Sequence, residues 1–247
     1  MRAFVKSELI KLATTRTVIG LVAGAAAVVG LGAFSTIMSG QAEGLNRPVH
    51  DQNFFMLASV NLALFALVLG IRAFTDEFRH GSIAPTLLIT PKRSRVVVAK
   101  IITTSAASAL LAAVAQAVML AVAAFLLPLK GADLLISSTD VTAMAGLVLA
   151  SALWGAIGAS VGAIVRHQVA AIVGALIWVL LLENLGSGLL RDAGRYLPGQ
   201  AAHAVAQASQ AATLLAPAVG ALVLVVYALA AGAAATLRMA RSDVTSA

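Results

Sequence analysis

The sequence predicts an all-α membrane protein with six transmembrane helices and both termini on the inner side of the membrane. Of its 247 residues, 60% are hydrophobic and only 11% are charged, and the mean hydropathy is +0.97. Soluble domains are about 45–50% apolar and about 25% charged. A chain with so few charges could not cover a water-exposed surface, so its composition indicates a membrane protein rather than a soluble enzyme.

Six apolar stretches supply the predicted spans. A helix needs about 20 predominantly apolar residues to cross the hydrocarbon core. We expect a single transmembrane domain over residues 1–247, with spans at about 17–38, 54–74, 99–127, 141–165, 169–185 and 213–237. The stretch 186–212 is weakly polar, and it predicts short helices that lie at the interface or are re-entrant. Backbone at membrane depth is tolerated there only against protein or a water-filled cavity.

The distribution of Lys and Arg predicts the orientation. Cytoplasmic segments of membrane proteins carry an excess of these residues. With the N-terminus inside, thirteen of the seventeen Lys and Arg residues fall on the inner side together with four acidic residues. The other four fall outside together with six acidic residues. This asymmetry predicts an N-in, C-in, multi-pass membrane protein.

The first sixteen residues mix apolar and basic side chains. Leu9, Ile10 and Leu12 alternate with charged residues such as Lys6 and Lys11. This pattern predicts an interfacial amphipathic helix on the inner leaflet, with a plain basic flank as the alternative. The apolar run that follows lacks a clear small-x-small cleavage site, so we interpret it as a retained first span rather than a signal peptide.

The inner segment between the second and third spans has the most informative pattern. Gly81-Ser82 suits a turn followed by a helix cap, and Pro85 suits the first helical turn. Three consecutive aliphatic residues, 87–89, then precede Pro91, which would end the helix. A solvated loop has no need of an apolar tip. The pattern therefore predicts a docking surface for another protein, with an ordinary basic loop as the alternative.

This segment resembles the signature of ABC type-two transporter permeases, the membrane subunits of ATP-binding cassette exporters. The resemblance rests on Glu77-x-Arg79-x-Gly81-Ser82, Leu87 or Leu88, Pro91, Arg95 and Lys100, with further matches at Glu8-Leu-x-Lys11-Leu, Glu183-Asn184 and Arg195-Tyr196-Leu197-Pro198. It implies that the segment forms a coupling helix seated in a groove of the ATPase. The candidate coupling residues are Glu77, Arg79, Gly81, Ser82, Thr86, Leu87, Leu88, Pro91 and Arg95. Pro85 departs from the family's pattern, which usually has an ordinary helix former there.

The resemblance also implies the partners. The chain has no Gly-x-x-x-x-Gly-Lys-Ser/Thr phosphate loop, so a separate ABC ATPase subunit is expected to bind ATP and Mg and to hydrolyse the ATP. The chain itself is expected to be no enzyme and to bind no cofactor, metal or nucleic acid; it has no Cys, and its four His are scattered. The resemblance places the chain in the bacterial cell membrane, where a second permease copy or a paralogue would complete a dimeric export pathway in the bilayer.

Three polar residues lie within or at the end of predicted spans. Asn61, Gln116 and Glu183 are candidate pathway residues, because polar side chains at such depth usually face the bundle interior or a water-filled path. Interhelical hydrogen bonds would also explain Asn61 and Gln116, and Glu183 could be a carboxylate in the headgroup region. Two glycine pairs, Gly20-x-x-x-Gly24 and Gly158-x-x-x-Gly162, have the spacing of close helix contacts.

Two other function classes stay open on the sequence alone. An accessory, immunity or sensor protein with six helices would have the same features as an exporter subunit. An intramembrane protease would need His and Glu, or Ser and His, paired at one depth within the spans. The histidines of this chain lie in loops or near the predicted membrane edges instead.

Overall fold

The computed structural model describes residues 7, 8, 10, 11, 14–38, 48–81, 93–131, 136–206 and 214–241, and for residues 48–60 and 191 it describes the backbone alone. All regular structure within these ranges is helical, which confirms the predicted all-α class. The segment 82–92, which joins the second and third predicted spans, lies outside the described residues.

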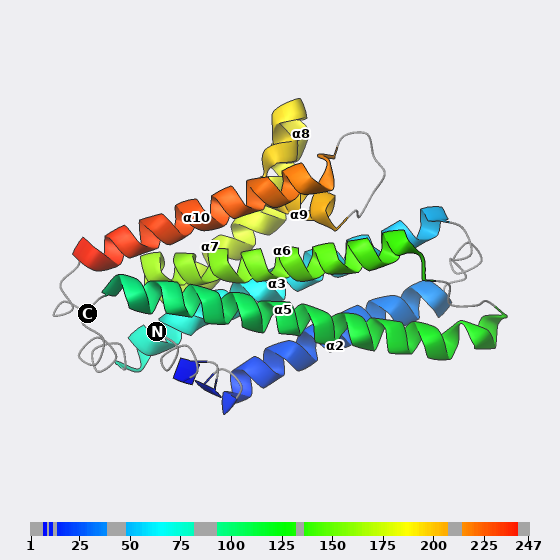
Figure 1. Cartoon of the computed structure of the whole chain (residues 1–247), viewed down its shortest axis with the longest axis horizontal. Helices are drawn as coiled ribbons and strands as arrows, with labels where there is room; N and C mark the ends of the chain where they lie inside the picture. Colours follow the sequence, from blue (N-terminus) through cyan, green and yellow to red (C-terminus); the bar gives the residue numbers. More distant parts are fainter. Residues whose placement is uncertain are drawn as a thin grey trace.

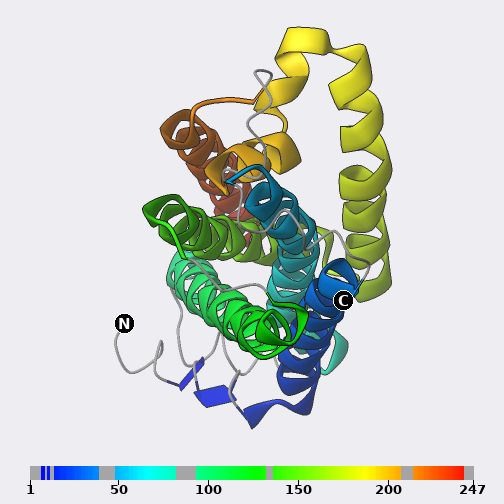
Figure 2. The ribbon, with the colours of Figure 1, turned by 90° about the vertical axis from the view of Figure 1, so that its right-hand side faces the viewer.

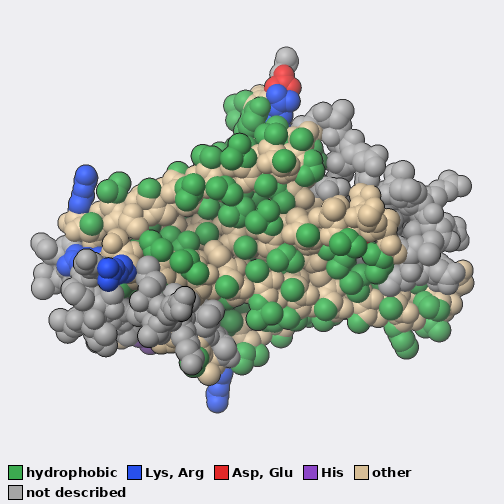
Figure 3. Space-filling view, in the orientation of Figure 1, with side chains coloured by type: hydrophobic (Ala, Val, Ile, Leu, Met, Phe, Trp, Pro, Cys, Tyr) green, Lys and Arg blue, Asp and Glu red, His purple; other side chains and the backbone are tan. Residues whose placement is uncertain are grey.

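Five long helices of the described chain run along the long axis of a bundle (Figure 1). They are α2 (Arg16–Met38), α3 (Pro48–Arg79), α5 (Arg93–Leu126), α6 (Ser138–Val165) and α10 (Pro217–Arg241). Successive helices alternate in direction, so α3, α6 and α10 end where α2 and α5 begin. We call this the basic end of the bundle, because most of the Lys and Arg side chains visible in Figure 3 gather there. The far end is called the opposite end.

The chain between α6 and α10 lies at one side of the bundle (Figure 2). The helix α7 (Gln168–Ile177) begins at the basic end and continues through a π-helical turn, η3 (Trp178–Leu182), into α8 (Glu183–Leu189). A 3-10 turn, η4 (Arg191–Tyr196), then leads into α9 (Pro198–Val205), which packs against α10 and α6. Short helices therefore occur in the stretch 186–212, as the sequence predicts.

Five segments of the described chain are long and apolar enough to cross a membrane, as in a multi-pass membrane protein. They are α2, α5 together with the 3-10 turn η2 (Pro128–Lys130), α6, α7 through α8, and α10. The predicted span 54–74 falls within α3, where side chains are described only from Asn61 onward. The sixth span and the orientation of the chain in the membrane therefore stay predictions.

Two helices extend beyond the predicted spans at the basic end. The helix α3 continues to Arg79 instead of ending at Phe74, and α5 begins at Arg93 instead of at Ala99. The charged residues of these extensions were expected in the loop, but two of them are paired: Glu77 with Lys100 of α5, and Asp76 with Arg72 within α3. Paired charges tolerate burial far better than isolated ones.

The helix α6 begins and ends at residues with specific local conformations. Its N-cap is Ser137, whose hydroxyl accepts a hydrogen bond from the Asp140 N–H, while the Asp140 carboxylate accepts one from the Ser137 N–H at 2.7 Å. This reciprocal capping box satisfies two otherwise unpaired donors. At the other end, Arg166 has φ +62°, the left-handed conformation that commonly terminates helices.

The centre of the bundle is a close contact between α3 and α6. In the most apolar 18-residue stretch of α6, 56% is buried inside the protein. The corresponding value for the segment from α7 through α8 is 11%. A Cβ added to Gly158 would collide with the backbone carbonyl of Leu67, and one added to Gly162 would collide with that of Ile71. The Gly158-x-x-x-Gly162 pair thus makes the predicted close helix contact. The pair at the start of α2 does not, because Gly20 has nothing within 4 Å and Gly24 meets only the side chain of Phe65.

Replacing Gly158 with alanine is expected to destabilise the fold, because the new methyl group would collide with backbone that cannot move aside. Overpacking of this kind costs about 1–3 kcal/mol, so the thermal unfolding midpoint of the purified protein in detergent should fall. The matched control is Gly20→Ala, where a new Cβ meets nothing. Equal midpoints for the two variants would contradict a backbone contact between α3 and α6.

Candidate functional site

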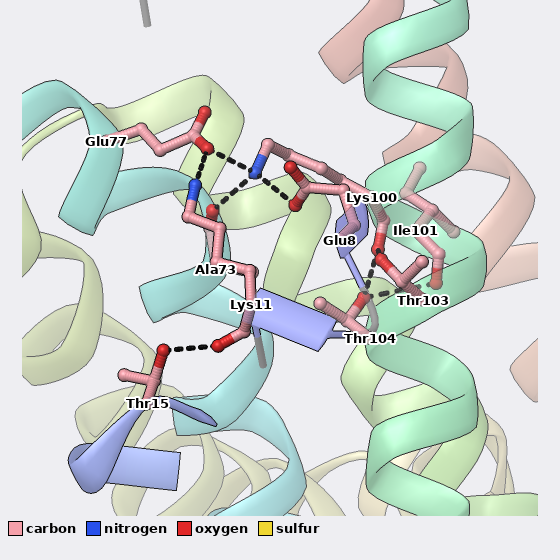
Figure 4. A network of polar contacts seen from close by, with 9 residues as sticks. All are labelled: Glu8, Lys11, Thr15, Ala73, Glu77, Lys100, Ile101, Thr103 and Thr104. Carbon is pink, nitrogen blue, oxygen red and sulfur yellow. Dashed lines mark hydrogen bonds and ion pairs between the residues drawn. The ribbon is translucent and has the colours of Figure 1, made fainter. Parts of the chain in front are cut away.

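Four charged side chains form a cluster at the basic end, which we call the buried charge cluster: Glu8, Lys11, Glu77 and Lys100 (Figure 4). Two of them come from the N-terminal segment, Glu77 comes from the last turns of α3, and Lys100 comes from the third turn of α5. The side chains of Lys100 and Glu77 are 1% and 2% exposed, and that of Glu8 is 9% exposed. The cluster therefore joins three segments of the chain inside the protein.

The ammonium group of Lys100 is at the centre of this cluster. Its Nζ lies 2.9 Å from Glu8 Oε2, 2.9 Å from Glu77 Oε1 and 3.1 Å from the carbonyl oxygen of Ala73. An ammonium group has three N–H donors and no acceptor, so these three acceptors satisfy it completely. The Nζ also lies 5.4 Å from the ring centroid of Phe74, which is within cation–π range.

Lys11 balances the charge of the cluster from its outer side. Its ammonium group is hydrogen-bonded to Glu77 Oε1, and its side chain is 52% exposed. Burial lowers the pKa of Lys11, but the hydrogen bond with Glu77 and the negative charge of the neighbouring carboxylates raise it by more. The pKa of Lys11 therefore lies above its ordinary value of 10.5. With two ammonium groups and two carboxylates, the cluster as a whole is neutral.

The ion pair of Glu77 and Lys100 lies at the base of the segment 82–92, close to where the chain leaves α3 and returns in α5. Desolvation makes a buried ion pair a poor net source of stability, but removing one partner is strongly destabilising because it leaves a buried charge without compensation. The two helix ends are therefore held in a fixed relation to each other. Through Glu8, the N-terminal segment is held to both of them.

The structure places four of the nine candidate coupling residues. Glu77 and Arg79 lie within α3, Gly81 follows it with φ +66°, and Arg95 is exposed in the first turn of α5. Glu77 was expected at the flank of an exposed loop, whereas it is buried inside the cluster. The remaining candidates lie outside the described residues: Ser82, Thr86, Leu87, Leu88 and Pro91.

Further contacts link the cluster's helices to α6, α7 and α10 at the basic end. The guanidinium of Arg79 donates to the Gln168 side chain at 3.1 Å, which connects α3 with the start of α7. Arg93 donates to the carbonyl oxygen of Met239 at 3.2 Å, which connects α5 with the end of α10. The guanidinium of Arg166, at the end of α6, lies 5.4 Å from the ring centroid of Phe78 in α3.

The three candidate pathway residues lie on three different helices: Asn61 on α3, Gln116 on α5 and Glu183 on α8. Gln116 is buried and donates from Nε2 to the carbonyl oxygen of Met144 in α6 at 3.3 Å. This contact joins α5 to α6, and it is an interhelical hydrogen bond of the kind expected as the alternative to a pathway role. Glu183 is only 3% exposed, accepts a hydrogen bond from Trp178 Nε1 at 3.1 Å, and is hydrogen-bonded to the backbone of Gly199. These two bonds connect α8 to η3 and to the start of α9.

Sequence reasoning did not find the link between Glu8 and Lys100, which are 92 residues apart. One signal was present, since Lys100 is a single charge at the start of a long apolar run, where an unpaired ammonium would be costly. That signal predicts a partner but does not identify it.

Comparison with known protein families gives no matching family model. A search of curated proteins gives no match either. The resemblance to ABC permeases therefore rests on the sequence motifs alone.

Replacing Lys100 with methionine is expected to cost about 3–5 kcal/mol of folding stability, because Glu8 would lose its ion-pair partner while still buried. Adding Glu8→Gln to this variant should recover part of the loss, since it removes the uncompensated charge. Thermal unfolding in detergent measures both effects. The control is Arg95→Met, an exposed cation on the same helix, which should change stability by no more than about 0.5 kcal/mol. A Lys100→Met variant as stable as this control would exclude the buried ion pairs.

Proposed function

We propose that this chain is the permease subunit of an ABC exporter, with six spans and both termini inside. In this proposal it forms half of a dimeric pathway, and a separate ATPase subunit binds ATP and Mg and drives transport. The observation that carries the proposal is the buried charge cluster at the base of the segment that resembles a coupling helix.

The cluster gives this segment the mechanical connection that a coupling element requires. A docked ATPase would push or pull on residues 82–92. Both ends of that segment lead directly into α3 and α5, which the Glu77–Lys100 pair holds together at 2.9 Å. Displacement of the segment would therefore move both helices as one unit. Because Lys100 is also bonded to Glu8, the N-terminal segment would move with them.

The close contact of α3 with α6 extends this connection toward the middle of the bundle. The Gly158 and Gly162 positions bring the two backbones together with no side chain between them. Packed elements of this kind transmit displacement because protein interiors have low compressibility. A movement of α3 at the basic end would thus reach α6.

The proposal also requires a second membrane subunit. The segment from α7 through α8 is the least buried of the five apolar segments. Large apolar side chains along it are exposed, among them Val169, Ile177, Leu181 and Leu185. Lipid chains or a second copy of the subunit can cover this surface, and we assign part of it to the partner permease.

Loss of the apolar tip of the segment is expected to release the ATPase. The test variant carries Leu87→Asp and Leu88→Asp, because charged residues at the centre of a docking surface remove its most important contacts. Affinity purification of the tagged chain from its native membranes, followed by mass spectrometry, should recover an ATP-binding cassette subunit with the wild type. Recovery from the double variant should fall by roughly tenfold or more, with unchanged amounts of the tagged chain.

The matched control is Leu129→Asp. This leucine is 70% exposed in η2 at the opposite end, far from the segment, so its replacement should leave recovery of the ATPase at the wild-type level. The proposal fails if the wild type recovers no such ATPase, or if the double variant recovers it as well as the wild type does.

A further inference from the structure

An open pocket of about 520 Å³ lies at the basic end, between the end of α6 and the end of α10. Its lining residues fall into two chemical kinds, arginines and small or aliphatic residues. They are Arg166, Arg238, Arg241, Ile164, Ala234 and Leu237. None of them takes part in the buried charge cluster, and none of them is acidic.

The two kinds of residue are arranged in layers along the helix axes. On α10, positions 234, 237, 238 and 241 share one face, because residues three, four and seven apart lie above one another on a helix. The apolar members of this face come first, and Arg238 and Arg241 follow in the last turn, at the basic end. On α6, Ile164 likewise precedes Arg166. The pocket therefore has an apolar inner wall and a cationic rim.

Two arginines of this rim, Arg238 and Arg241, are available to a ligand. Arg238 and Arg241 are exposed, and neither takes part in a salt bridge with any other described residue. Arg166 is half-buried, with its guanidinium placed over the ring of Phe78. Burial, followed by the positive charges of Arg238 and Arg93, lowers the pKa of Arg166 below its ordinary value. Like charges this close repel one another, so the rim favours an anion among them.

We infer that this pocket binds an anionic phospholipid of the surrounding leaflet, with its phosphate between Arg166, Arg238 and Arg241. Guanidinium groups bind phosphate oxygens through paired, charge-assisted hydrogen bonds. The apolar wall beside the cationic rim favours a lipid over a free anion, because the acyl chains of the lipid would pack along Ile164 and Leu237. The side chain of Leu237 is 58% exposed and directly adjoins the rim. This inference requires the chain to lie in a membrane, but it does not depend on an ATPase partner.

Native mass spectrometry of the purified protein in detergent tests the inference. Phosphatidylglycerol and phosphatidylcholine with identical acyl chains are added at equal concentrations, and the bound fraction of each is measured. The wild type should bind a larger fraction of phosphatidylglycerol than of phosphatidylcholine. In the variant Arg238→Gln/Arg241→Gln this preference should fall by roughly fivefold for each arginine removed, since a basic residue near an anionic membrane surface contributes about that factor. The control Arg16→Gln, an exposed cation of α2 outside the pocket, should keep the preference.

Two further measurements separate the alternatives. Inorganic phosphate is added to the lipid-loaded wild type at the lipid's concentration; if it displaces the lipid, the pocket is a free-anion site and the lipid assignment is wrong. The variant Arg238→Lys/Arg241→Lys keeps both positive charges, so it should keep most of the preference for phosphatidylglycerol over phosphatidylcholine. Its thermal unfolding midpoint shows whether substitution at these two positions unfolds the protein. If the glutamine variant retains phosphatidylglycerol as the wild type does, the inference is overturned.

Discussion

The arrangement of the basic end depends on one constraint, the burial of the Lys100 ammonium group. A charge with 1% of its side chain exposed must have its partners in place, or the folded state loses several kcal/mol. Its partners come from two segments that are distant in sequence, Glu8 near the N-terminus and Glu77 with Ala73 in α3. The N-terminal segment, α3 and α5 therefore have one mutual placement in which every donor of Lys100 is satisfied.

Around this rigid centre the other contacts at the basic end are weaker. Arg79 with Gln168 and Arg93 with Met239 form hydrogen bonds from arginine side chains that are not buried, and each contact of this kind contributes little net stability. By contrast, α3 and α6 are joined through backbone contacts at Gly158 and Gly162. The bundle thus has a closely connected unit of α3, α5 and α6. At this end α10 joins the unit through apolar packing, because Ala235 and Met239 are buried in one cluster with residues of all three helices.

Composition and hydropathy predict the helices well, because an apolar stretch of span length has few alternatives to a helix in a membrane. The helix ends are harder to predict. Asp76 and Glu77 look like loop residues in sequence, but in the helix Asp76 pairs with Arg72 and Glu77 pairs with Lys100. The glycine pairs make the same point, since Gly20 and Gly158 have the same spacing to a second glycine. Only Gly158 meets a neighbouring backbone, and no local pattern contains that information.

The positive charge of the basic end divides into two parts with different consequences. Lys100 and Lys11 are neutralised within the buried charge cluster, and Arg72 is paired with Asp76 at 3.0 Å, so these cations contribute little field outside the protein. Arg238 and Arg241 have no such partner among the described residues and face outward. A count of Lys and Arg in sequence treats both parts alike when it predicts orientation. The folded protein separates them, because the paired cations connect helices while the unpaired ones remain available to the anionic groups of a membrane surface or of a ligand.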